Sequence, residues 1–436
     1  MEPITAGDLV ELATDVGPVP MNVAVVLDLA PVPGGVEVLA AEVGRRLAGV
    51  PRLRRRLVTR TWGRRPCWVD DGDFDVARHV SIAAGDPAAL DPVLEAAADV
   101  VTTPLPRDRP LWRAVVVTGA PDGGVGVVVV MHHVVADGIG GLALLAEIAD
   151  RTAEPAARAA GDAPAQAERP RAPAPDRSSD PGSGQATTRR ALPAALTALR
   201  HARVELGGGR LAPRCSLNAP TGPRRAFARV EVDLDPIRRA ARRHGATVND
   251  ALLVAVTGAM ARLLTHRGDV PPAELVVSVP VSARPATTST DLGNRVGVMP
   301  VRVPLDGPPA SRLARVARQT QARKAGTRGA SAAVVGPLFR ALAAVGVFRR
   351  FVDRQRLVNS FLTNLRGPAT TLHLAGAPIR RMVPLTITAG NVGVAFAAFS
   401  YDGTLGVTLI ADPGVVPDTQ TLASALETEL LDLTSG

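Results

Sequence analysis

Residues 125–138 read Val125-Gly-Val-Val-Val-Val-Met131-His132-His133-Val-Val-Ala-Asp137-Gly138, and this stretch decides the fold around it. The run from Val125 to Met131 is β-branched and almost uninterrupted, which is typical of a strand buried on both faces. Apolar residues then recur at helical spacing, so a turn that carries Asp137 and Gly138 joins the strand to a helix. The two histidines therefore lie at a strand end, where rigid scaffolds hold reactive side chains.

The chemistry of this strand end favours one histidine as a general base. A neutral imidazole can take a proton from a hydroxyl group near pH 7. Side chains alternate along a strand, so His132 and His133 are expected to point to opposite faces, and only one of them can face a given channel. Asp137 is close enough to orient the site by hydrogen bonds or to pair with an arginine elsewhere. Gly138 is expected to adopt a positive φ and to leave room for a substrate.

Three other interpretations of these residues stay open. Two adjacent histidines on a buried strand are also typical of hydrogen-bonded core residues. His132, His133 and Asp137 are metal-ligand types, although no cysteine or further histidine lies nearby in the sequence to complete a ligand set. Residues 138–143 match the loose G-x-G-x-x-A pattern of dinucleotide-binding turns, but a proline-rich segment follows where the second strand of such a site belongs.

The sequence His132-His133-Val-Val-Ala-Asp137-Gly138 resembles the HHxxxDG signature of coenzyme A-dependent acyltransferases. Almost the whole chain is similar to the bacterial wax ester synthase/diacylglycerol acyltransferase family. HHxxxDG alone also occurs in peptide-synthetase condensation domains, so the ordered set of further motifs is the more specific feature. These motifs are Asp8, Pro20-Met21-Asn22-Val23, Arg109-Pro110-Leu111-Trp112, Val248-Asn249-Asp250, Gly293-Asn294-Arg295, and Thr363-Asn364 with Gly367-Pro368.

The resemblance implies an α/β fold of two chloramphenicol-acetyltransferase-like domains, with mixed sheets and a central channel between them. It also implies direct acyl transfer from an acyl-coenzyme A to diacylglycerol or a long-chain fatty alcohol, with His133 as the general base. The acyl-coenzyme A is then a substrate, and neither a cofactor nor a metal is expected.

The same resemblance assigns expected roles to further residues. His132 and Asp137 are expected to shape the turn beside the base. Contacts to substrate are expected from Gly138, Asn249, Asp250 and Asn294, and Asn249 or Asn294 is the candidate donor to the developing oxyanion. The alternative for Asn249 and Asp250 is that they cap a helix and contact no substrate. Arg284 or Arg295 could pair with Asp137 or meet a phosphate group. A structural motif is expected at Pro110, Leu111 and Trp112.

Two other functions fit the sequence. A condensation-like enzyme would join a carrier-bound acyl group to an amine or a hydroxyl group. A non-catalytic lipid-binding protein would keep the fold without the base, but the intact His133, Asp137 and Gly138 count against it. No G-x-S-x-G motif occurs, which argues against a serine hydrolase.

Composition along the chain predicts two domains and a linker. The 436 residues suffice for two sizeable cores. Residues 1–150 alternate strand and helix, as in a mixed α/β domain. Residues 151–190 contain almost no large apolar side chain and predict a flexible linker. Residues 191–436 form the second domain, in which Thr247 is expected to cap a helix with Asp250 as its capping-box partner.

The charge of the chain comes largely from arginine. Lysine and arginine number 50 against 41 acidic residues, and Lys324 is the only lysine. The basic clusters at residues 52–56 and 349–351 could contact anionic lipid or the phosphates of coenzyme A, but a solvated basic surface is the simpler interpretation. They match no nucleic-acid-binding motif, so no nucleic-acid partner is expected. Cys67 and Cys215 have no spacing that suggests a disulfide framework or a zinc site.

Apolar segments of the chain are too short or too interrupted to predict a membrane span, and the N-terminus lacks the pattern of a signal peptide. A cytoplasmic location is therefore expected. The most apolar candidate, residues 332–348, contains Pro337 and Arg340 and is interpreted as a core helix. The alternative for this segment is peripheral association with a membrane or a lipid droplet.

Overall fold

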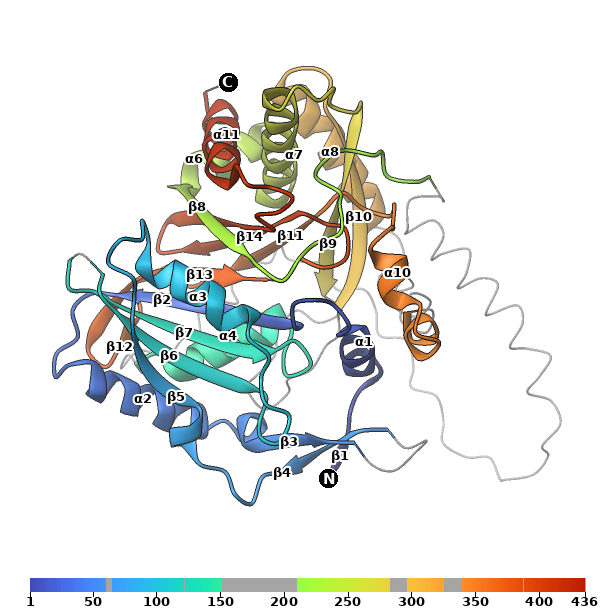
Figure 1. Cartoon of the computed structure of the whole chain (residues 1–436). Coiled ribbons are helices and arrows are strands. Elements are labelled where there is room, and N and C mark those ends of the chain that lie inside the picture. Colours follow the sequence, from blue (N-terminus) through green and yellow to red (C-terminus); the bar gives the residue numbers. More distant parts are fainter. Residues whose placement is uncertain are drawn as a thin grey trace, which may run out of the picture.

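Two six-stranded mixed sheets form the framework of the chain, one below the other in Figure 1. The computed structural model describes residues 1–59, 65–120, 122–150, 210–282, 296–324, 339–386 and 388–435. The linker expected at residues 151–190 lies outside these residues. Parallel and antiparallel pairs occur in both sheets, in agreement with the predicted mixed α/β fold.

The first sheet holds the histidine strand near its centre. Its strands, in spatial order, are β12 (His373–Leu374), β13 (Ala377–Leu385), β2 (Asn22–Leu29), β7 (Val125–His132), β6 (Trp112–Thr118) and β5 (Val80–Ala84). A small separate sheet near the N-terminus consists of β1 (Glu2–Pro3), β4 (Cys67–Asp70) and β3 (Arg55–Val58).

The second sheet is built entirely from the second half of the chain. Its strands, in spatial order, are β10 (Val296–Pro304), β9 (Glu274–Ser282), β11 (Ser360–Arg366), β14 (Val394–Tyr401), β15 (Thr404–Ala411) and β8 (Ala226–Asp233). The α-helices whose bounds are described are α1 (Ala6–Thr14), α2 (Val36–Ala48), α3 (Pro92–Thr102), α4 (Gly138–Ile148), α6 (Leu234–Arg243), α7 (Val248–His266), α8 (Pro309–Lys324), α10 (Phe348–Val352) and α11 (Thr419–Asp432). Short 3₁₀ turns occur at Pro51–Arg54 and Val76–Arg78.

Helices on both sides of the first sheet explain the uninterrupted apolar run of β7. All eight residues of β7 are buried. Alternate residues, among them Val127 and Val129, pack in the core that includes α2 and α4, whereas Val128 packs with α3 on the other face. Gly126 permits the close approach of α3, because a Cβ atom there would lie 2.1 Å from a methyl carbon of Val93. The prediction of a strand buried on both faces is confirmed.

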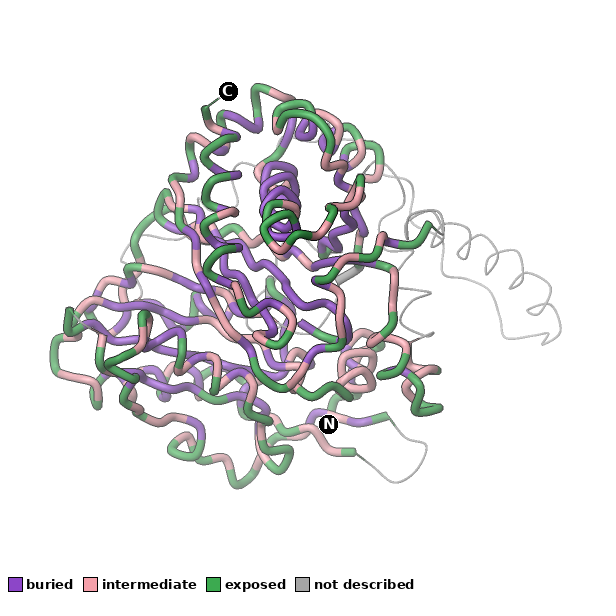
Figure 2. Tube along the Cα trace, turned by 45° about the horizontal axis from the view of Figure 1, so that its top comes forward, coloured by how far each residue is buried: buried purple, intermediate pink, exposed green. Residues whose placement is uncertain are grey.

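Helix α7 is the centre of the second half. It packs with α11, α8 and α6 against the second sheet, and Figure 2 shows buried residues along most of its length. Its first turn has the predicted capping box, in which the side chains of Thr247 and Asp250 bond to each other's backbone N–H. Among the described helices, α7 alone has the length and hydropathy of a membrane span, and 72% of that apolar stretch is buried. Packing inside the protein accounts for this apolar composition.

The segment interpreted as a core helix, residues 332–348, reaches the surface where it is described. Residues up to 338 lie outside the described part. Val345 is 70% exposed and Val347 is 42% exposed, whereas Phe348 is buried. The prediction of a core helix is therefore wrong for the described end of this segment, because its aliphatic side chains are not covered by the sheets or the other helices.

Strand exchange joins the two halves of the chain. β12 and β13 lie within the second half of the sequence but belong to the first sheet, where β13 pairs antiparallel with β2. Phe399 and Tyr401 of β14 also pack in the core of the first half. The domain ranges expected from composition are therefore crossed by a strand pair and by shared core residues. Because of this exchange, neither half completes its packing alone.

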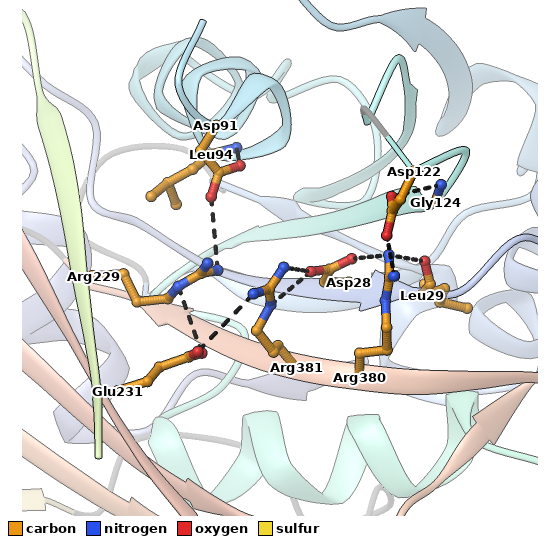
Figure 3. Close-up of polar contacts among 10 residues, drawn as sticks. All are labelled: Asp28, Leu29, Asp91, Leu94, Asp122, Gly124, Arg229, Glu231, Arg380 and Arg381. Carbon is orange, nitrogen blue, oxygen red and sulfur yellow. Dashed lines mark hydrogen bonds and ion pairs between the residues drawn. The ribbon is translucent and has the colours of Figure 1, made fainter.

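An ionic cluster around Asp28 fixes the exchanged strand (Figure 3). A β-bulge interrupts the register between Ile379 and Arg381, so that Arg380 and Arg381 both reach Asp28 of β2. Nη2 of Arg380 lies 3.1 Å from one oxygen of Asp28, and Nε of Arg381 lies 2.7 Å from the other. Arg380 also bonds to Asp122, and this hydrogen bond lowers the pKa of Asp122 to about 2.

The cluster continues to the second sheet. Arg229 of β8 lies between Glu231 of the same strand and Asp91, which precedes α3, and Arg381 reaches Glu231 at 4.0 Å (Figure 3). The described members carry three positive and four negative charges, so the cluster is nearly neutral. These ion pairs therefore connect strands of both sheets with a helix of the first half.

We expect Asp28→Ala to lower the free energy of unfolding by about 1–2 kcal/mol, because two arginines lose the carboxylate that they share in a partly buried position. Urea unfolding at pH 7 measures the difference. Asp122→Ala is the control, since it removes an exposed carboxylate that pairs with one arginine and accepts the backbone N–H of Gly124, and it should lower the free energy of unfolding by less than Asp28→Ala does. Equal losses in the two variants would contradict a special role of Asp28 in fixing β13.

Candidate functional site

Backbone hydrogen bonds from both neighbouring strands hold the two histidines. The N–H of His132 donates to the carbonyl of Leu111 at 3.0 Å, and the N–H of His133 donates to that of Met21 at 2.7 Å. Leu111 directly precedes β6 and Met21 directly precedes β2. The histidine pair is thus fixed between the starts of the two strands that flank β7.

Strand alternation does not extend to His133, because β7 ends at His132 and His133 is the first residue of the turn that follows. The expectation that the two side chains point to opposite faces therefore stays a prediction. Both imidazoles lie near carboxylates at α1 or its C-terminal end: Asp15 for His132 and Glu11 for His133.

His132 is locked in one orientation. Its Nδ1 accepts a hydrogen bond from the backbone N–H of Val134 at 3.1 Å, so Nδ1 carries no proton. Nε2 then carries the proton and donates to Asp15 at 3.2 Å. Burial alone would raise the pKa of Asp15, but the hydrogen bonds from His132 and Met21 and the charge of Arg107 lower it overall. Asp15 therefore stays ionised as the acceptor for His132.

His133 is the more accessible member of the pair. Its side chain is 24% exposed, against 5% for His132. Nδ1 of His133 lies 3.9 Å from Oε2 of Glu11, whose side chain is 23% exposed. The geometry thus gives the two histidines different surroundings, one buried and fixed by hydrogen bonds, the other partly open beside a carboxylate.

Asp137 and Gly138 begin helix α4. Asp137 is 2% exposed and is the N-cap, since its Oδ1 accepts a hydrogen bond from the N–H of Gly140 at 2.9 Å. The expectation of a positive φ at Gly138 is wrong, because Gly138 is the first residue of α4. A Cβ atom on Gly138 would lie 3.2 Å from a methyl group of Leu365 on β11. A side chain of the second half of the chain, Leu365, therefore packs next to Gly138.

The Pro110-Leu111-Trp112 segment has a structural place beside the histidines. The indole N–H of Trp112 donates to the carbonyl of Leu53 at 2.7 Å, and its ring stacks on His79 with centroids 4.5 Å apart. Burial lowers the pKa of His79, although its hydrogen bond to the Trp112 carbonyl raises it, so His79 stays neutral in this stack. Trp112 thus anchors the start of β6. The preceding residue, Leu111, accepts the backbone hydrogen bond from His132.

Asn249 and Asp250, the substrate-binding residues expected on α7, have no described contact with the histidine turn. Asp250 is 1% exposed, and its two oxygens accept hydrogen bonds from Thr247 and, at 2.7 Å, from the hydroxyl of Thr320. These bonds favour a capping role for Asp250. Asn249 is partly exposed on the same turn, and no described contact joins either residue to the histidine turn.

Some expected residues cannot be compared with the structure. Asn294, Arg284 and Arg295 lie outside the described residues, so their expected roles stay predictions. Among the residues that are described, no group of three His, Cys, Asp or Glu side chains is arranged to hold a metal ion.

Sequence reasoning missed Glu11, Asp15 and Leu365. Asp8, Glu11 and Asp15 are spaced by three and four residues, which places acidic side chains on one face of a helix. That spacing was available in the sequence, but only the folded chain shows that this face meets the histidines. Leu365 directly follows Thr363-Asn364, and it is the residue of this segment that lies beside Gly138.

Comparison with known proteins gives matches over nearly the whole chain. The catalytic domain of the wax ester synthase/diacylglycerol acyltransferase family matches residues 5–252, and the C-terminal domain of the same family matches residues 292–434. A putative diacylglycerol O-acyltransferase of Mycobacterium bovis and a probable one of Mycobacterium tuberculosis are each 30% identical over 402 residues, which cover 90% of this chain and 86% of those proteins.

Solved structures share the fold. A wax ester synthase/diacylglycerol acyltransferase from Marinobacter aquaeolei superposes with a TM-score of 0.70 at 20% identity and covers 99% of this chain and 98% of that one. The first condensation domain of the CDA synthetase gives 0.60 at 17% identity, with 99% and 94% covered. These matches confirm the predicted fold class. With both family domains matched in order, the chain belongs to the wax ester synthase/diacylglycerol acyltransferase family.

Proposed function

We propose that this protein is an acyl-coenzyme A-dependent O-acyltransferase that esterifies diacylglycerol or a long-chain fatty alcohol, with His133 as the general base. The names of its mycobacterial relatives support diacylglycerol as an acceptor, and the family name supports fatty alcohols. The acyl-coenzyme A is a substrate in this proposal, and the reaction requires no further cofactor.

The observation that carries the proposal is the different state of the two adjacent histidines. Both ring nitrogens of His132 are engaged in hydrogen bonds, with Val134 and Asp15, so this ring has no nitrogen left to serve as a base. His133 is partly exposed, and its backbone N–H is fixed by Met21. A base needs a ring that substrate can reach, and of the two histidines His133 has the more exposed side chain.

The proposed reaction is a direct transfer. A ring nitrogen of His133 takes the proton of the acceptor hydroxyl, and the oxygen forms a bond with the thioester carbonyl carbon. The carbon–sulfur bond then breaks, and the coenzyme A thiolate takes the proton from the imidazolium. The thioester is already activated, so positioning of two substrates and proton transfer suffice and no acyl-enzyme is needed.

We also propose that the enzyme meets these lipid substrates at a membrane or lipid-droplet surface from the cytoplasmic side, through residues 345–351. Val345 and Val347 are exposed there beside the exposed Arg349 and Arg350. Exposed aliphatic side chains next to arginines favour contact with anionic lipid.

His133→Ala should lower kcat by about 10²-fold to 10⁴-fold, the range expected when a general base is removed. Release of free coenzyme A from palmitoyl-coenzyme A, with hexadecanol or dioleoylglycerol as acceptor, measures the rate. His266→Ala is the control, because it removes an exposed histidine at the end of α7. Circular dichroism of both variants verifies their folding.

Acceptor-dependent release that is lost only in His133→Ala supports the proposal and ranks the two acceptors. A native rate in His133→Ala would exclude this residue as the base. Activity with a palmitoyl carrier protein but none with palmitoyl-coenzyme A would instead support the condensation-like alternative.

The double variant Val345→Glu, Val347→Glu should bind vesicles of phosphatidylglycerol and phosphatidylcholine about 10-fold more weakly, because two exposed apolar side chains become anionic. Co-sedimentation with the vesicles measures the bound fraction. Val38→Glu is a matched control, since Val38 is 52% exposed on α2. Equal binding by all three proteins would argue against a lipid contact at this segment.

A further inference from the structure

One end of helix α1 brings a carboxylate to each histidine. Glu11 lies within α1, and Asp15 is the residue at its C-terminal cap, four positions later. Residues four apart lie on the same side of a helix, and the histidines they meet are adjacent in sequence. Asp15 meets His132, and Glu11 meets His133. Figure 1 shows α1 as a separate short helix next to the start of β2.

The position of α1 is fixed independently of the histidines. Thr5 and Asp8 form a capping box at its first turn, and Asp8 is 1% exposed. At its other end, Asp15 accepts hydrogen bonds from Arg107 at 2.6 Å and from the N–H of Met21 at 3.1 Å. The helix that presents Glu11 is therefore anchored at both ends, and Glu11 is held near His133 by the fold.

We propose that Glu11 is a positioning residue for His133: its carboxylate faces Nδ1, which leaves Nε2 as the atom that takes the proton from the acceptor hydroxyl. This inference rests on the proposed function of His133. The observed separation of 3.9 Å between Oε2 and Nδ1 is an ion-pair distance, and hydrogen bonds of catalytic groups commonly tighten when substrate binds.

The charge of Glu11 matters during the reaction. When Nε2 accepts the proton of the hydroxyl group, the ring becomes a cation, and the nearby carboxylate stabilises that cation by attraction. The proton then passes to the coenzyme A thiolate, and the ring returns to its neutral form. Glu11 forms no bond to either substrate.

Other charged groups around the turn are already engaged in the structure. Asp15 bonds to His132, Arg107 and Met21, while Asp8 caps α1 and Asp137 caps α4. Each of these holds a segment of backbone or the neighbouring ring. Glu11 differs from them because its described ion pair is with His133 itself, and because its side chain, like that ring, is partly exposed.

The first test is the steady-state rate of Glu11→Gln with palmitoyl-coenzyme A and hexadecanol. We expect kcat to fall about 10-fold to 100-fold while KM for each substrate stays within about twofold, because Glu11 contacts neither substrate. Glu37→Gln is the matched control: Glu37 is an exposed glutamate in the first turn of α2, and its replacement should leave both constants unchanged. A native kcat in Glu11→Gln, or a loss that appears only in KM, would overturn the inference.

A second measurement separates positioning of the base from a structural role. The acceptor 2,2-difluorohexadecanol has a more acidic hydroxyl group than hexadecanol and depends less on a base. The loss caused by Glu11→Gln should therefore be at least several-fold smaller with the fluorinated alcohol. A purely structural defect would lower the two rates by the same factor.

The two proposals fail in different ways. If His133→Ala keeps the native rate, the function proposed for His133 is wrong and the role of Glu11 falls with it. If His133→Ala is inactive while Glu11→Gln has native kcat with both alcohols, His133 remains the base and only the role of Glu11 is overturned.

Discussion

The two backbone hydrogen bonds that flank the histidine pair are the constraint on which the site depends. They tie His132 to Leu111 and His133 to Met21, so the end of β7 is held from both neighbouring strands. A strand buried on both faces supplies the rigidity, since its side chains are packed by α2 and α4 on one side and by α3 on the other. The side chain of His133 can therefore be partly exposed while its backbone stays fixed by hydrogen bonds.

Exchange between the halves of the chain joins the two sheets. β13 enters the first sheet through its pairing with β2, and the bulge at Arg380 lets two successive arginines share Asp28. Asp28 pairs with Gly126, at the end of β7 that is far from His132, so this cluster fixes the sheet and does not border the histidine turn. At the histidine end, Leu365 of β11 approaches Gly138, so a residue of the second half lies beside the turn.

Local patterns in the sequence predicted local structure well. The β-branched run of β7 and the Thr247–Asp250 capping box each depend on neighbouring residues, and the structure confirms both. The family resemblance predicted a structural motif at Pro110, Leu111 and Trp112, but the hydrogen bonds of Leu111 to His132 and of Trp112 to Leu53 emerge only from the fold. The predicted positive φ at Gly138 was wrong because helix α4 begins one residue earlier than the turn pattern suggested.

Long-range relations were beyond the sequence patterns. The place of β13 depends on a contact between residues about 350 positions apart, and no periodicity in either strand specifies it. The acidic face of α1 was visible as spacing, but its partner could not be read from residues 8–15 alone. Glu11 and Asp15 acquired a functional interpretation only when the fold placed them beside the two histidines.

The most direct test of His133 as the base is a crystal structure with hexadecanol and S-hexadecyl-coenzyme A, a thioether that cannot transfer its chain. The hydroxyl oxygen of the alcohol should lie about 2.6–3.2 Å from Nε2 of His133, with Nδ1 still facing Glu11. A hydroxyl group bound at His132, or a His133 ring turned away from the alcohol, would contradict the assignment of His133 as the base.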